Sequence, residues 1–189
     1  MSLATEQAVA DFVADAVKAG RPITIEGGGT RSAVTRPVQS EETLKLSGLT
    51  GITLYEPAEM VIGAWAGTTL AEIEAALAEK NQILSFEPAD YRTALGTEGE
   101  PTIGGVVAGN ISGPRRILAV LPDNLIGVRF VNWREIIKNG GRAEERRPDG
   151  HIDRYWGRWR ERRISRLPRA RKPHACVEVV HRPIIAQHD

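Results

Sequence analysis

The chain has 189 residues, of which 41% are hydrophobic, and its 25 Lys and Arg against 24 Asp and Glu leave a formal net charge of +1. This length suffices for one domain with its own core. A net charge near zero gives no global electrostatic reason to expect DNA or an anionic membrane as a partner. A single cysteine, Cys176, excludes an intrachain disulfide and a cysteine metal cluster, so we predict no metal site.

The N-terminal region predicts a helix and then a strand. Apolar residues at helical spacing give residues 5–19 one apolar face, with Thr5 as the N-cap. The β-branched run Ile23–Glu26 predicts a strand. The acidic residues of this helix exclude a secretory signal, and no apolar run has the length of a membrane span. We therefore expect a cytoplasmic protein.

A glycine-rich loop follows the first strand. It consists of Gly27, Gly28, Gly29, Thr30, Arg31 and Ser32. Glycine lets a backbone approach a ligand closely, and successive N–H groups form concavities that bind phosphate. The spacing is not the dinucleotide fingerprint, because Ser32 stands where its third glycine belongs, and no Gly-Lys-Ser/Thr of a Walker loop occurs.

The next seventy residues alternate short strands with one clear helix. Residues 30–48 are polar and turn-rich, and residues 90–101 are expected to be an irregular link. Thr69 and Glu72 have the spacing of a capping box, which predicts a helix from there to about Lys80. Alternating or β-branched apolar residues predict strands over 52–55, 60–66, 83–86, 126–132 and 135–138. The fold class is α+β.

A second glycine-rich stretch extends from Thr102 to Arg116, with four glycines and one proline in fifteen residues. Two interpretations remain open for it. The glycines could let backbone N–H groups cradle a diphosphate. Alternatively, they could only relieve crowding in a tight buried turn.

Four motifs together carry a family resemblance. The segments 25–32, 66–70, 86–88 and 102–116 resemble, in this order, the FAD-binding domain of the vanillyl-alcohol oxidase and p-cresol methylhydroxylase type, over roughly residues 5–142. Within that superfamily, Ser112–Arg116 and Gly127–Asn132 are most similar to the FAD-binding subunits of bacterial glycolate oxidases (glycolate dehydrogenases). The resemblance implies two small lobes with FAD between them, and hydride transfer from a 2-hydroxy acid to the flavin.

The resemblance also implies which residues hold the cofactor. They are Gly27, Gly28, Gly29, Thr30, Arg31 and Ser32 in the first loop, and Thr102, Ile103, Gly104, Gly105, Ala108, Asn110 and Gly113 in the second stretch. The first loop lacks the histidine that attaches flavin covalently in some relatives, so we expect noncovalent FAD. Arg115 and Arg116 are candidates for pairing with a substrate carboxylate, or form a basic surface turn. The implied partners are a second flavin subunit and an iron–sulfur subunit of a glycolate oxidase complex.

The composition changes near Arg142, where the resemblance ends. From there on the chain has twelve arginines, one lysine, seven acids and all four histidines, and we identify no catalytic base in the sequence. We expect residues 1–142 to be an incomplete FAD-binding domain and residues 143–189 to be an irregular, arginine-rich tail.

Three interpretations of this tail remain open. It is an out-of-frame or truncated ending, a basic tail that grips RNA, or a solvated extension in which residues 177–180 pair as a late strand. The RNA interpretation supports a second hypothesis for the whole chain. In that hypothesis the protein is a non-catalytic binding protein whose glycine loops are structural.

Overall fold

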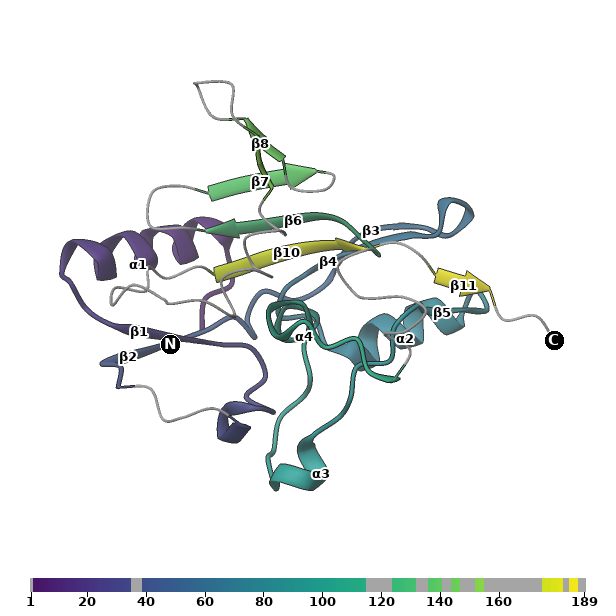
Figure 1. Cartoon of the computed structure of the whole chain (residues 1–189), viewed down its shortest axis with the longest axis horizontal. Coiled ribbons are helices and arrows are strands. Elements are labelled where there is room, and N and C mark those ends of the chain that lie inside the picture. Colours follow the sequence, from purple (N-terminus) through teal and green to yellow (C-terminus); the bar gives the residue numbers. More distant parts are fainter. Residues whose placement is uncertain are drawn as a thin grey trace.

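The structure is a computed structural model in which the N-terminal two thirds of the chain and a few later segments are described. The described residues are 2–34, 39–114, 124–131, 136–140, 144–146, 152–154, 175–181 and 184–186. They include both helices and short strands, and the largest sheet is antiparallel throughout, which confirms the α+β class (Figure 1).

The N-terminal unit is built from one helix and a two-stranded parallel sheet. It contains α1 (Glu6–Lys18), β1 (Ile23–Glu26) and β2 (Glu42–Lys45). Val9 and Val13 are fully buried one turn apart, and the Thr5 side chain accepts a hydrogen bond from Ala8 N at 3.2 Å, as the sequence predicts. These valines pack with Leu44 of β2 in one hydrophobic cluster. Strand β2 was not predicted, because it lies in a stretch with many turn residues.

A five-stranded sheet forms the second unit, in the order β3-β4-β10-β6-β7. All its pairs are antiparallel. The strands are β3 (Ile52–Glu56), β4 (Val61–Trp65), β10 (Ala175–His181), β6 (Leu125–Val131) and β7 (Ile136–Gly140). A short 3₁₀ turn, η2 (Pro57–Glu59), joins the first two.

Two helices cover one face of this sheet. Figure 1 shows α2 (Leu70–Ala78) and α4 (Ile103–Gly109) beneath the strands, and α3 (Arg92–Leu95) farthest from them. Residues of both covering helices and of the sheet form the larger hydrophobic cluster, in which Ile73, Leu77 and Phe86 are almost completely buried. The remaining elements are η1 (Ser32–Val34), β5 (Gln82–Leu84), β8 (Glu144–Arg146), β9 (Ile152–Arg154) and β11 (Ile184–Ala186).

The C-terminal segment is not irregular throughout. Strand β10 lies in the centre of the sheet, where Val179 pairs with Ala64 of β4 on one side and with Val128 of β6 on the other. This confirms the late strand over residues 177–180 and corrects the expectation of a wholly irregular tail. Most of residues 143–174, including the arginine- and tryptophan-rich run 155–163, lies outside the described residues. The domain boundary near residue 142 stays a prediction.

Two further expectations about local structure were wrong. The stretch that begins at Thr102 was interpreted as a loop or turn, but it forms helix α4. The link over residues 90–101 was expected to be irregular, but it contains the helical turn α3, which Gly96 ends in the left-handed conformation. Both elements lie close to the first glycine loop.

Candidate cofactor-binding site

The first glycine loop presents a run of unpaired backbone donors. Strand β1 ends at Glu26, and the N–H groups of residues 27–31 donate no hydrogen bond to any described residue. Gly29 has φ +75°, a conformation that glycine adopts without strain. Successive free N–H groups in such a turn bind anions, so this loop has the donor set that a diphosphate needs.

The second glycine-rich stretch differs, because its first N–H groups are already paired inside the protein. Ile103 N donates to Thr68 O at 3.0 Å, and Gly104 N donates to Ala66 O at 2.9 Å. Gly105 N donates to the side chain of Thr102, the N-cap of α4, at 3.4 Å. Two stretches that look alike in sequence therefore differ in their hydrogen bonding: the N–H groups of residues 27–31 are unpaired among the described residues, and those of residues 103–105 are bonded.

The two stretches are in direct contact. A Cβ atom at Gly27 would overlap the Thr102 hydroxyl, and a Cβ at Gly28 would overlap the backbone carbonyl of Glu100. A Cβ at Gly104 would come within 2.7 Å of Ala66. At these positions glycine permits the close approach of two parts of the chain, which is the crowding interpretation that the sequence left open.

Arg31 joins the two stretches with its side chain. Its Nη1 donates to Gly105 O at 3.2 Å, and its guanidinium lies 5.8 Å from the centre of the Tyr91 ring. Burial lowers the pKa of Arg31, and the nearby Tyr91 and Asp90 partly oppose this effect. Its Nε is buried and donates to no described group. A buried donor without a partner is uncommon, so Arg31 has an unused donor for an anion. It is half-buried, which does not fit a solvated surface arginine.

The other predicted site residues lie around this centre. The Ser32 hydroxyl donates to Gly29 O at 3.1 Å, so it stabilises the turn itself. Ala108 and Asn110 are exposed near the C-terminal end of α4, where Asn110 is the C-cap with φ 50°. Gly113 packs on the backbone carbonyl of Glu87, with no space for a Cβ. Arg115 and Arg116 lie outside the described residues.

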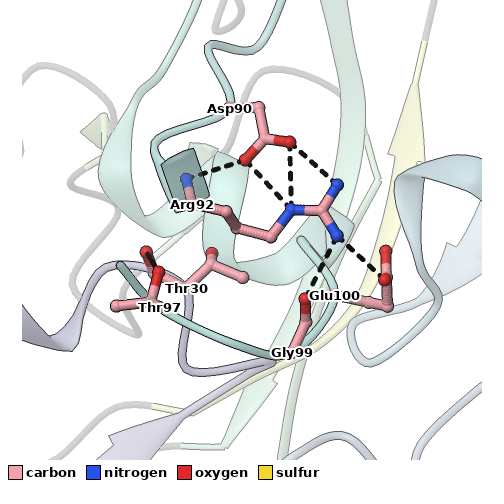
Figure 2. A network of polar contacts seen from close by, with 6 residues as sticks. All are labelled: Thr30, Asp90, Arg92, Thr97, Gly99 and Glu100. Atoms are coloured by element: carbon pink, nitrogen blue, oxygen red, sulfur yellow. Dashed lines mark hydrogen bonds and ion pairs between the residues drawn. The ribbon is translucent and has the colours of Figure 1, made fainter. Parts of the chain in front are cut away.

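The structure adds a segment that the sequence analysis missed. Residues 90–100 cross the first glycine loop, and an ion-pair network around Arg92 holds them together (Figure 2). The available signal was the spacing of Asp90 and Arg92 ahead of Gly96 and Gly99, which is typical of a compact turn rather than an irregular link.

Comparison with known proteins supports a flavin site. The family model described as "FAD binding domain" matches residues 1–139. The chain belongs to this family. FAD is therefore the cofactor of the domain, and the unpaired loop donors and Arg31 fit its negatively charged diphosphate.

The chain is also similar to one curated protein and to two solved structures. It is 36% identical over 126 residues to glycolate oxidase subunit GlcE of Escherichia coli (strain K12). That alignment covers 66% of the chain but only 34% of GlcE, so the chain spans about a third of this relative. Two structures of an alkyldihydroxyacetonephosphate synthase, at 17% and 18% identity, have the same fold with TM-scores of 0.68 and 0.66. They match over 98% of this chain and 31% of their own.

Neither a membrane-spanning helix nor a metal-binding cluster occurs among the described residues. No helix there is long and apolar enough to cross a bilayer. Within the same residues, no group of three or more His, Cys, Asp or Glu side chains could hold a metal ion.

Proposed function

We propose that the chain is the FAD-binding part of an oxidoreductase subunit of the glycolate oxidase type. The main observation that supports a cofactor site is the run of unpaired N–H groups in residues 27–31. The similarity to GlcE supports the choice of a 2-hydroxy acid such as glycolate as the substrate.

In this proposal, the first loop holds the diphosphate of FAD. The N–H groups of residues 27–31 donate to its oxygens, and the guanidinium of Arg31 offsets part of its charge. The N-terminal part of α4 supports this loop, and the residues that form this part are Thr102, Ile103, Gly104 and Gly105. Ser32, Ala108, Asn110 and Gly113 complete the proposed contact surface.

When bound, FAD would be the acceptor of a hydride from the α-carbon of the hydroxy acid. The protein would bind and orient the reactants. We assign no base for the hydroxyl proton. The proposed partners are a second flavin subunit and an iron–sulfur subunit, to which the electrons would pass.

The visible absorption spectrum of the purified full chain tests cofactor binding. Bound flavin should absorb at about 450 nm. Because the first loop has no histidine, acid precipitation should release the yellow cofactor into the supernatant. Flavin that stays in the pellet would contradict noncovalent attachment. A chain that stays colourless after incubation with FAD would contradict the whole proposal and favour the structural interpretation of the glycines.

Dye reduction with glycolate or D-lactate tests the activity. The resemblance places the substrate pocket between the FAD-binding domain and a cap domain, so we expect the 189 residues alone to show no turnover. Turnover by the chain alone would show that it contains a base and a carboxylate-binding group, and Arg115 and Arg116 would be the first residues to substitute.

A further inference from the structure

The segment Asp90–Glu100 contacts the first glycine loop at three successive places. The Thr97 hydroxyl donates to Thr30 O at 2.9 Å. The backbone of Gly99 and Glu100 packs on Gly28 so closely that neither Gly28 nor Gly99 has space for a Cβ. The Tyr91 ring lies under the Arg31 guanidinium. These contacts fall on the loop whose N–H groups are unpaired, so the segment determines how those groups are arranged.

Arg92 holds the two ends of this segment together. Toward the beginning, its Nε lies 3.1 and 3.0 Å from the two carboxylate oxygens of Asp90, and its Nη2 lies 2.8 Å from Oδ2. Toward the end, its Nη1 donates to Gly99 O at 3.2 Å and to Glu100 Oε1 at 2.8 Å (Figure 2). One planar guanidinium thus fixes the positions of Asp90, Gly99 and Glu100, and such multiple bonding is specific to arginine.

The apolar core does not hold the segment in place. Helix α3 has a single turn and no buried residue, and Tyr91 is 38% exposed. A helix this short is not stable by itself. The described contacts that fold the segment back on itself are the Arg92 network and three turn hydrogen bonds. Leu95 N donates to Tyr91 O at 2.9 Å, Thr97 N donates to Arg92 O at 3.2 Å, and Gly96 N also donates to Arg92 O.

We propose that Arg92 is a positioning residue for cofactor binding, which preorganises the N–H groups of residues 27–31 through the segment Asp90–Glu100. This inference rests on the proposed diphosphate-binding role of the first loop. Arg92 does not touch the cofactor itself. It lowers the cost of ordering the loop when a diphosphate binds, which is the usual effect of preorganisation.

The chain offers a closely matched control. Arg21 forms an ion pair with Glu42, and the Arg21 and Arg92 side chains are 33% and 34% exposed. Arg21 precedes β1, at the opposite end of this strand from the glycine loop. R92Q and R21Q therefore remove equally exposed arginine ion pairs, but only the first should affect the loop.

The test measures the affinity of the full chain and both variants for FAD, for ADP as a minimal diphosphate, and for riboflavin, which has no phosphate. R92Q should weaken the binding of FAD and of ADP by about tenfold, as loss of an orienting partner typically does, while riboflavin binding stays unchanged. R92K should recover only part of the affinity, because an ammonium cannot reproduce the bidentate geometry. R21Q should bind all three as the parent does. Equal weakening of FAD and riboflavin by R92Q, or none, would overturn the proposal.

Amide hydrogen exchange tests the positioning role without a ligand. In R92Q the Leu95 and Thr97 amides should exchange faster, and the amide chemical shifts of residues 27–31 should move, whereas R21Q should leave both unchanged. Unchanged exchange and shifts in R92Q would overturn the proposal whether or not FAD binds. Failure of the parent chain to bind FAD would instead refute the proposed function.

Discussion

The backbone carbonyl of Glu100 occupies the space in which a side chain at Gly28 would begin. Both groups belong to the main chain, so neither can move aside without displacing its segment. One is in the first glycine loop, and the other is at the end of the segment that Arg92 closes. The loop is therefore shaped by a contact between two residues that are 72 positions apart in the sequence.

Alanine at Gly28 should consequently disturb both segments. We expect Gly28→Ala to destabilise the fold by about 1–3 kcal/mol, as overpacking does, and to abolish FAD binding. Gly105→Ala is the control for stability, because its Cβ would meet only the Thr102 hydroxyl, at 3.3 Å, and alanine favours a helix. Thermal unfolding of both variants measures the difference. Equal thermal midpoints of the two variants would show that the Glu100 backbone can shift at little cost in stability.

The hydroxyl of Thr68 should contribute clearly to stability. Thr68 is fully buried, and its Oγ1 accepts from Gly51 N at 3.0 Å and donates to Gly51 O at 3.1 Å. Thr68→Val keeps the shape but leaves the N–H of Gly51 without its partner, whereas Gly51 O still accepts from Trp65 N at 3.0 Å. We therefore expect a loss of about 1–3 kcal/mol in the free energy of unfolding. Urea denaturation measures this loss. Thr68→Ser keeps the hydroxyl and should cost less. The opposite order would contradict the hydrogen-bond explanation.

The ion pair between Glu6 and Arg129 should matter more than an exposed one. It joins the first turn of α1 to β6 and is partly buried, with side chains 16% and 27% exposed. Arg129 also lies 5.9 Å from the centre of the Trp65 ring. We expect Glu6→Gln to cost about 1–3 kcal/mol in the free energy of unfolding, because a partly buried guanidinium loses one charged hydrogen-bond acceptor. Asp15→Asn, which removes an exposed pair with Lys18, should change stability by less than about 0.5 kcal/mol. Similar losses in the two variants would contradict this argument.

Acid should loosen the segment that Arg92 holds. Hydrogen bonds from the side chain and then the backbone of Arg92 lower the pKa of Asp90, and the charge of Arg31 adds to this effect. A carboxyl whose pKa is depressed on folding stabilises the fold above its unfolded pKa of about 3.9, and this contribution disappears as the pH falls through the folded value.

The segment should accordingly stay intact between about pH 5 and 8 and loosen below about pH 4. The amide chemical shift of Thr97, followed against pH, measures this change, because Thr97 N donates to the Arg92 carbonyl. Asp90→Asn should remove the acid transition. A transition near pH 6 would implicate a different titrating group.

The sequence predicted those elements whose signals are local. The N-caps Thr5 and Thr69 bond to amides only three residues away, so residue type and spacing were enough to place α1 and α2. Helix α4 was missed because three of its seven residues are glycines, which disfavour a helix. It forms because Gly104 packs on Ala66 and its amide donates to the Ala66 carbonyl.

By itself, the sequence determined the α+β class, the phosphate-binding composition of the first loop and the family resemblance, since these depend on residue type and spacing along the chain. The tertiary structure decided which glycines offer free N–H groups and which only make room for another part of the backbone. It also decided that β10 lies between β4 and β6, and that Arg92 closes the segment over Gly28. These relationships join residues far apart in the chain, and only packing brings such residues into contact.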